Sequence, residues 1–139
     1  MKCALILLFL LGAVLGHAAP EDGSKEFWSE FRAAVAKGDK DKIAFMTNFP
    51  FSISGELDGD PVTTVSKEKF PVVLEKRLSQ QALQLSRGRV VSKTMRQIID
   101  DRAIIAEADY AGANTIVIEM FVFEKMQGKW WFKRAYVEQ

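Results

Sequence analysis

Apolar side chains recur at helical spacing in residues 24–38, "SKEFWSEFRAAVAKG". The residues that fall on one helical face are Phe27, Trp28, Phe31, Ala34 and Val35. Ser24 is a typical N-cap, because its hydroxyl can accept a hydrogen bond from a free amide of the first turn. Gly38 is a typical helix stop. The pattern predicts an amphipathic helix with one buried face.

A second, shorter helix is predicted for residues 40–47, "KDKIAFMT". Asp39 precedes this segment as an N-cap. Ile43 and Met46 fall on its inward side at helical spacing. Pro50 prevents the helix from continuing, since its ring removes a backbone donor and clashes with the preceding turn.

Residues 51–78 predict a strand, a turn and a helix in succession. Residues 51–54, "FSIS", alternate and predict a short strand. Residues 55–61, "GELDGDP", are rich in Gly and Asp and predict a turn. Ser66 opens a third predicted helix that runs to Leu78. Pro71 lies near its first turn, where the missing N–H costs least.

From Gly88 onward the hydrophobic pattern is that of strands. Four segments rich in β-branched and aromatic residues are separated by short turns: residues 89–99, 102–110, 114–125 and 129–138. Successive strands with short connections predict an antiparallel meander of about four strands, joined by the short strand before it. Helices first and strands afterwards are typical of an α+β domain with its helices on one face of the sheet.

The third of these segments is apolar on both faces. Ile116 and Ile118 fall on one side, and Val117, Phe121 and Phe123 on the other. One face can pack on the helices, whereas the other needs a second cover. A homodimer formed through the sheet is the simplest such cover.

The last two segments form a hairpin if Gln127 and Gly128 make a two-residue turn, a turn type that favours Gly. The expected pairs are Lys125 with Trp130, Phe123 with Phe132, Phe121 with Arg134, and Glu119 with Tyr136. Because side chains alternate, one surface would then carry Phe121, Phe123, Trp130, Phe132, Glu119, Arg134 and Tyr136. A three-residue loop would move the side chains of the second strand to the opposite face.

This register points to one group of candidate functional residues. Glu119 would lie in an aromatic surface beside the cation of Arg134 and the phenol of Tyr136. The functional interpretation makes Glu119 and Tyr136 catalytic candidates, and makes Glu119, Arg134, Tyr136 and Phe121 the lining of a ligand site. The structural interpretation, which we favour, is an ion pair between Glu119 and Arg134 that satisfies both groups at the sheet.

The start of the chain predicts export. Residues 1–18 have a basic residue, Lys2, then an apolar run and small residues at the end, as in a cleavable signal peptide. The run is short for a membrane span, which needs about 20 residues. We therefore expect one domain in residues 19–139, secreted or periplasmic, with no stable membrane anchor after cleavage. An uncleaved N-terminal anchor is the alternative.

Composition excludes several chemistries from that domain. The only Cys (Cys3) and the only His (His17) lie in the predicted signal peptide. Disulfides, Ser-His-Asp or Cys-His catalysis, and zinc sites built on imidazole or thiolate are therefore not expected. We expect no metal and no cofactor. Without Lys2, 18 basic residues balance 18 acidic ones, and this balance argues against a nucleic-acid partner.

One block of the chain is nevertheless basic. Between Glu75 and Asp100 there is no acid, and the bases are Lys76, Arg77, Arg87, Arg89, Lys93 and Arg96. The functional interpretation is a patch for an anionic partner such as a membrane surface or a polyanion. The simpler interpretation, which we favour, is a solvated region balanced by the acids that follow.

The order of these elements resembles the nuclear-transport-factor-2-like (cystatin-like) superfamily of cone-shaped α+β domains. The segments that carry the resemblance are "FWSEFRAAVAKGDKDKIAFMTNFPF" and "FVFEKMQGKWWFKRAY", the second being similar to the family's F-x-x-x-x-G-K-W closing hairpin. The resemblance implies a strongly curved sheet around an internal cavity, and often a dimer. Members include ketosteroid isomerase, scytalone dehydratase and non-catalytic binding modules. The missing His counts against the dehydratase chemistry.

Two functions follow as hypotheses. The preferred one is an exported non-catalytic module that binds a small apolar ligand or dimerises through its sheet. The alternative is a small proton-transfer enzyme, an isomerase or dehydratase, that uses a pocket carboxylate and a tyrosine, with Glu119 and Tyr136 in those roles.

Overall fold

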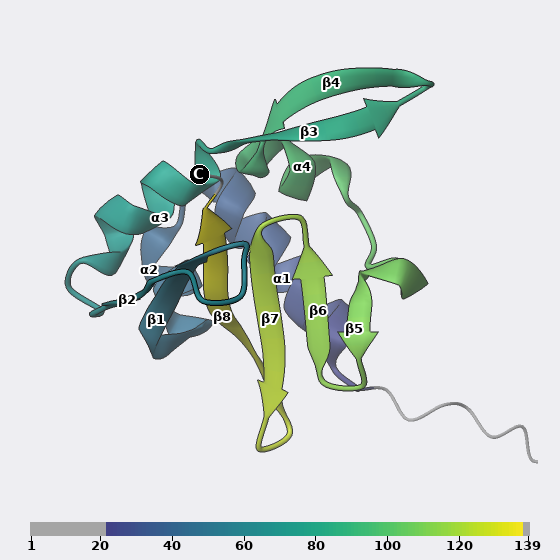
Figure 1. The fold of residues 1–139 in the computed structure, drawn as a ribbon. Coiled ribbons are helices and arrows are strands. Elements are labelled where there is room, and N and C mark those ends of the chain that lie inside the picture. Colours follow the sequence, from purple (N-terminus) through teal and green to yellow (C-terminus); the bar gives the residue numbers. More distant parts are fainter. Residues whose placement is uncertain (1–21, 138–139) are drawn as a thin grey trace, which may run out of the picture.

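The computed structural model describes residues 22–137 (Figure 1). The predicted signal peptide therefore lies outside the described residues. The helices are α1 (Ser24–Lys37), α2 (Lys40–Phe45), α3 (Phe70–Leu78), α4 (Met95–Asp101) and the single 3₁₀ turn η1 (Glu107–Asp109). The strands are β1 (Thr47–Gly55), β2 (Val62–Val65), β3 (Gln81–Ser86), β4 (Arg89–Thr94), β5 (Tyr110–Gly112), β6 (Thr115–Ile118), β7 (Phe121–Met126) and β8 (Lys129–Val137). The predicted α+β class is confirmed.

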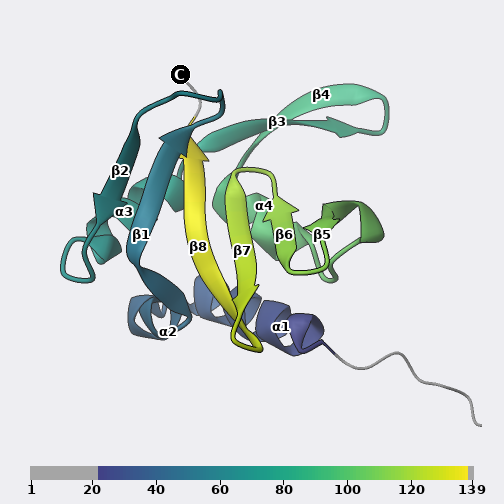
Figure 2. The same cartoon turned by 60° about the horizontal axis from the view of Figure 1, so that its bottom comes forward.

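The main sheet has six strands in the order β2-β1-β8-β7-β6-β5, seen nearly face-on in Figure 2. The sheet is mixed, because β1 runs parallel to β8 whereas every other pair of neighbouring strands in this sheet is antiparallel. The expectation of a purely antiparallel sheet was therefore wrong. The expected strong curvature was also wrong, since the sheet is not strongly curled.

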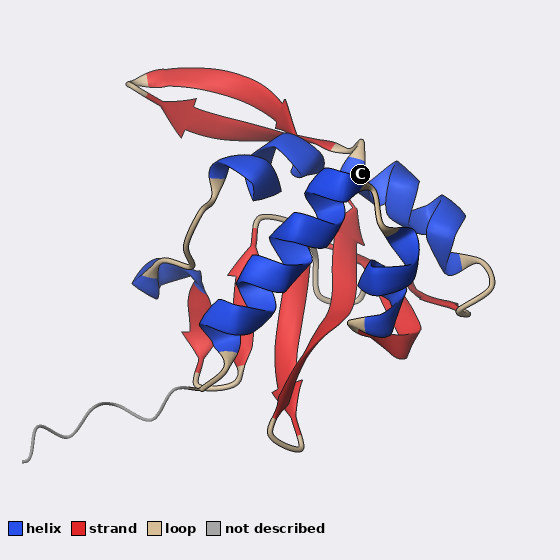
Figure 3. Cartoon of the chain, turned by 180° about the vertical axis from the view of Figure 1, so that it is seen from behind, coloured by secondary structure: helices blue, strands red, loops and turns tan. Residues whose placement is uncertain are grey.

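Helix α1 crosses one face of this sheet, as the view from behind shows (Figure 3). Its Phe31 packs on Phe123 and Phe132 of the sheet, with ring centroids 5.0 and 5.3 Å apart. Phe132 in turn lies 4.7 Å from Phe51 and 4.8 Å from Phe121. These rings are at most 1% exposed. Aromatic side chains thus fill the layer between α1 and the sheet, where the resemblance implied a cavity.

The predicted first two helices are confirmed with small changes. Gly38 ends α1 with a positive φ of 67°, and Asp39 caps α2 by accepting from the amide of Lys42. Ser24 is the first residue of α1, whereas we predicted it to be the N-cap; that position belongs to Gly23. The chain already becomes a strand at Thr47, so β1 is longer than the predicted 51–54.

The predicted strand at residues 89–99 was wrong beyond Thr94. There the chain enters α4, because the Thr94 hydroxyl accepts from the amide of Gln97 and the Gln97 side chain accepts from the amide of Thr94. This reciprocal capping box starts a helix. The predicted strand at 102–110 is largely loop and η1, and β5 begins only at Tyr110.

Helices α1 and α4 are held together by crossed arginine contacts. Arg32 of α1 donates from Nε to the carbonyl oxygen of Ile99 at 3.0 Å, and a second nitrogen contacts the carbonyl of Asp100. Arg96 of α4 donates to the carbonyl oxygen of Val35 at 3.0 Å. Each helix therefore supplies a cation to the final carbonyls of the other, where the helix dipole favours positive charge.

Strands β3 and β4 form a separate two-stranded sheet that projects from the body (Figures 1 and 3). β3 was not predicted from the sequence. The two strands meet at a tight turn in which Arg87 and Gly88 both have positive φ, 50° and 75°. No helix of the described residues is long and apolar enough to span a membrane.

Candidate functional site

The β7–β8 hairpin contains most of the predicted site residues, and its register is only partly the predicted one. Lys125 pairs with Trp130 and Phe123 with Phe132, as predicted. The register then shifts between Val122 and Phe123, so that Phe121 pairs with Ala135. The predicted pairing of Phe121 with Arg134 was therefore wrong. An extra residue in β8 produces this bulge and turns Arg134 to the other face.

The bulge separates the predicted cluster. Arg134 forms an ion pair with Glu124, so the predicted ion pair between Arg134 and Glu119 was wrong. Glu119 is exposed in the tight β6–β7 turn, with φ 50°, and accepts a 2.7 Å hydrogen bond from Nε2 of Gln84. These positions do not bring Glu119 into a buried aromatic surface.

The other two predicted site residues lie in different environments. Phe121 is fully buried in the core against Phe132. Tyr136 is half-buried at the end of β8, next to Ser54 of β1, and its amide donates to the carbonyl of Met120. Strand alternation puts Tyr136 and Arg134 on the same face, opposite Ala135.

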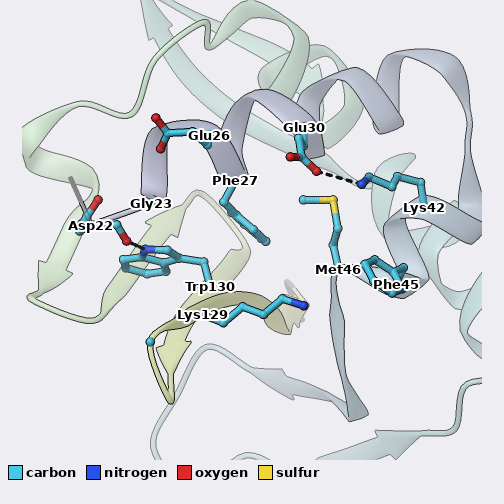
Figure 4. Close-up of a pocket in the computed structure, with 11 residues that line it drawn as sticks. Asp22, Gly23, Glu26, Phe27, Glu30, Lys42, Phe45, Met46, Lys129 and Trp130 are labelled. Carbon is cyan, nitrogen blue, oxygen red and sulfur yellow. Dashed lines mark hydrogen bonds and ion pairs between the residues drawn. The ribbon is translucent and has the colours of Figure 1, made fainter.

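A pocket of about 270 Å³ lies elsewhere, where α1 begins and the β7–β8 turn meets the end of α2 (Figure 4). It is open to solvent on one side. The residues that line it are Asp22, Gly23, Glu26, Phe27, Glu30, Lys42, Phe45, Met46, Gly128, Lys129 and Trp130. Phe27 and Met46 were predicted to face the core and Trp130 to lie on the aromatic surface of the hairpin, so a pocket lined by all three was not predicted.

The apolar part of this pocket is built from side chains that the core holds in place. Met46 and Trp130 are buried, and Phe27 is half-buried. The Trp130 indole N–H donates to the carbonyl oxygen of Asp22 at 2.9 Å. The Phe27 ring packs edge-on against Phe123 at 5.7 Å. Fixed apolar groups of this kind make a preformed surface for an apolar ligand.

Charged groups surround the apolar surface. Glu30 and Lys42 form an ion pair of 2.9 Å between α1 and α2. Lys129 lies over two rings, 5.2 Å from the centre of Phe45 and 4.2 Å from that of Trp131. Glu26 is exposed in the first turn of α1 and forms no ion pair with a described residue. The rim therefore offers carboxylates along α1 and ammonium groups on the opposite side.

Asp22 closes one end of the pocket. Hydrogen bonds from the hydroxyl and amide of Ser24 lower the pKa of its carboxyl group, with the hydroxyl making the larger contribution and partial burial opposing both. The same hydroxyl lies 2.7 Å from the phenol oxygen of Tyr110. At neutral pH the Asp22 carboxylate is therefore negatively charged and hydrogen-bonded to Ser24, and it can hold the start of α1 in place.

The pocket combines an apolar floor with charged groups at its rim. No group of three or more potential metal ligands occurs among residues 22–137. Near the apolar floor the polar groups are carboxylates and ammonium ions, and the two that contact each other, Glu30 and Lys42, neutralise one another. The arrangement can hold an apolar body and orient a polar end.

A second surface is the face of the main sheet turned away from α1, which no helix covers in Figure 2. Val122 is 2% exposed there but does not belong to the main core cluster. Glu124 and Arg134 pair on this face, and Trp131 is half-buried beside Glu124. The surface therefore combines apolar side chains with a neutralised ion pair.

Comparisons with known proteins found no similar protein. No family model, no curated protein and no solved structure matches this chain.

Proposed function

We propose that this protein is an exported, non-catalytic binding module that holds a small apolar molecule in the pocket at the start of α1. The observation that carries the proposal is the pocket itself, in which Phe27, Met46 and Trp130 form an apolar floor fixed by core contacts. Apolar pockets with a few polar groups at the rim are typical small-molecule sites. Export is proposed from the sequence of residues 1–18 alone.

The rim favours a ligand with one polar end. An apolar or aromatic body would lie on Phe27 and Met46, away from water. A donor or cationic group would reach Glu26, which has no ion-pair partner among the described residues. An acceptor would reach Lys129, whose ammonium group lies over aromatic rings.

Fluorescence of the uncharged dye N-phenyl-1-naphthylamine tests the proposal. The dye brightens in apolar pockets, and we expect saturable binding to the protein. Phe45→Ala removes a rim side chain that is 67% exposed and should weaken binding about fivefold, since it removes apolar contact area. Val72→Ala, at a 77% exposed position outside the pocket, is the matched control. Absent binding, or equal loss in both variants, contradicts the proposal.

A homodimer through the uncovered face of the sheet is a second proposal for the same module. It is supported by the half-buried Trp131 and by the Glu124–Arg134 pair, which neutralises charge on that face. Light scattering over a range of concentrations measures it directly. Trp131→Glu should shift a dimer to a monomer, whereas a wild-type protein that stays monomeric throughout would reject this interface.

The geometry favours proton-transfer catalysis less. Glu119 is exposed and bonded to Gln84, outside the desolvated setting that tunes a catalytic carboxylate. Kinship with the nuclear-transport-factor-2-like superfamily remains a proposal supported by the order of the elements, while the mixed, weakly curved sheet departs from it.

A further inference from the structure

The β3–β4 hairpin has two unlike faces. The register pairs Leu85 with Val90 and Leu83 with Ser92 on one face, and Ala82 with Lys93 and Gln84 with Val91 on the other. Ala82 is buried against the body, so that face points inward. Leu83, Leu85 and Val90 are 70%, 77% and 68% exposed. The outward face is therefore a continuous row of aliphatic side chains in water.

Exposed apolar side chains are concentrated in this row. Among residues 22–137, eight large apolar side chains are strongly exposed, and three of them lie on this one hairpin. Single exposed apolar residues are ordinary on protein surfaces, but neighbouring ones mark an interaction site. The row is not explained by the core, because the core contacts the opposite face.

The charged side chains at the tip of the hairpin have one sign. The structure separates five of the six bases of this region into two sets, and the sixth, Lys76, is exposed on α3. Arg96 pairs with Glu75, Lys93 pairs with Asp101, and Arg77 is buried with a 2.7 Å hydrogen bond to Gln80. Arg87 and Arg89, by contrast, are exposed at the tip, and no described carboxylate lies within ion-pair distance of either.

The hairpin is fixed at its base. Gln84 donates to Glu119 at 2.7 Å, and Lys93 contacts Asp101 at 2.6 Å. The amide of Met95 donates to the carbonyl of Gln80 at 2.8 Å. An isolated two-stranded hairpin is marginal in water, so these contacts hold it in the orientation seen in Figures 1 and 3. The tip is therefore presented at a distance from the body.

We propose that the outward face of the β3–β4 hairpin binds the surface of an anionic lipid membrane. Leu83, Leu85 and Val90 enter the boundary between headgroups and acyl chains, and Arg87 in the turn contacts the headgroups. Arg89, which pairs with Ser86 on the opposite face, reaches the headgroups beside the tip of the hairpin. Basic side chains flanking an apolar surface are the combination that such membranes attract. Both strands have a free edge of peptide groups, so the hairpin binds at the interface and does not cross the hydrocarbon.

Two other occupants fit less well. Single-stranded nucleic acid is bound through aromatic rings that stack on bases, and residues 81–94 contain no aromatic residue. A second copy of the chain would need an interface of about 20–30 residues on each side. The outward row offers three apolar side chains, fewer than such an interface uses.

Co-sedimentation with vesicles tests the proposal on the full domain. Wild type should sediment with phosphatidylcholine vesicles that contain phosphatidylglycerol and much less with phosphatidylcholine alone. Arg87→Gln/Arg89→Gln should weaken binding about fivefold per arginine. Leu83→Ser/Leu85→Ser should weaken it about tenfold or more, because the apolar row no longer leaves water.

Matched controls come from exposed residues elsewhere. Leu57→Ser changes a 73% exposed leucine in the β1–β2 turn, and Lys25→Gln/Lys67→Gln removes two charges from other elements. Both should bind like wild type. Equal losses in the controls, no preference for anionic vesicles, or loss of self-association in the leucine variant without lipid binding would overturn the proposal. Preferential binding to an RNA oligonucleotide would also overturn it.

This proposal does not depend on the pocket. Phe45→Ala should leave vesicle binding unchanged, and the hairpin variants should leave dye binding unchanged. A negative result in one experiment would therefore count against one proposal and leave the other untouched.

Discussion

The β7–β8 and β3–β4 hairpins have turns of the same type, but the first lies within the main sheet and the second projects into solvent. Gln127–Gly128 has φ values of 51° and 77°, and Arg87–Gly88 has 50° and 75°. Positive φ at both central residues is the geometry of a type I′ turn, which matches the twist of the strands. One hairpin lies in the centre of a six-stranded sheet, whereas the other projects into solvent as a sheet of its own.

The difference arises from the residues on the strands. Phe121, Phe123 and Phe132 fall on one face of β7–β8 and pack under α1. In β3–β4 the large aliphatic residues fall on the face opposite to the buried Ala82. Turn chemistry thus specifies that a hairpin forms, and the phase of alternation relative to the body decides whether it joins the core.

The largest expected effect is the loss of a core ring. Phe132→Ala should lower the free energy of unfolding by about 3–5 kcal/mol, because it leaves a cavity among five aromatic rings. Leu85→Ala, in the projecting hairpin, should change it by no more than about 0.5 kcal/mol. Urea denaturation followed by tryptophan fluorescence measures both. Similar losses would show that the two hairpins are equally integrated.

A smaller effect is expected from the turns themselves. A Cβ at Gly128 or Gly88 meets nothing within 4 Å, so Ala at either position costs only the positive φ, about 1–2 kcal/mol. At Gly128 this cost should appear as lower global stability. At Gly88 it should appear as faster amide exchange in residues 81–94 with unchanged global unfolding. A matching global loss at Gly88 would contradict this separation.

The smallest effect concerns the anchor of the projecting hairpin. Gln84→Ala removes the hydrogen bond to Glu119 and should favour local opening of β3–β4 by about 1 kcal/mol. A double-mutant cycle with Glu119→Ala isolates the pair from any change in the β6–β7 turn. Hydrogen exchange of residues 81–94 is the readout. Additive effects of the two substitutions would mean that this contact does not hold the hairpin.

Local signals along the sequence predicted part of this fold well. The apolar face of α1, the stop at Gly38 and the cap at Asp39 were readable because each depends on a few neighbouring residues. The turn at Gln127–Gly128 and its first two pairs were readable for the same reason. The capping box at Thr94 was also present in the sequence, but the β-branched residues before it favoured a longer strand.

The candidate site was harder to predict, because it depends on two features without a local signal. The bulge in β8 moves Arg134 away from its expected face, and nothing in "FKRA" marks it. Glu119 adopts positive φ in a turn that has neither Gly nor Asn. The pocket, in turn, joins the start of α1, the end of α2 and the turn at Gly128. Only the tertiary arrangement brings these segments together.

The crossed arginine contacts between α1 and α4 have a mechanical consequence. Thr94 is at once the last residue of β4 and the N-cap of α4, so the projecting hairpin continues directly into a helix of seven residues. That helix is too short to persist alone, and Arg32 and Arg96 fasten it to the last turns of α1. The direction in which the hairpin points is therefore set by α1, a helix that ends more than forty residues before the hairpin begins.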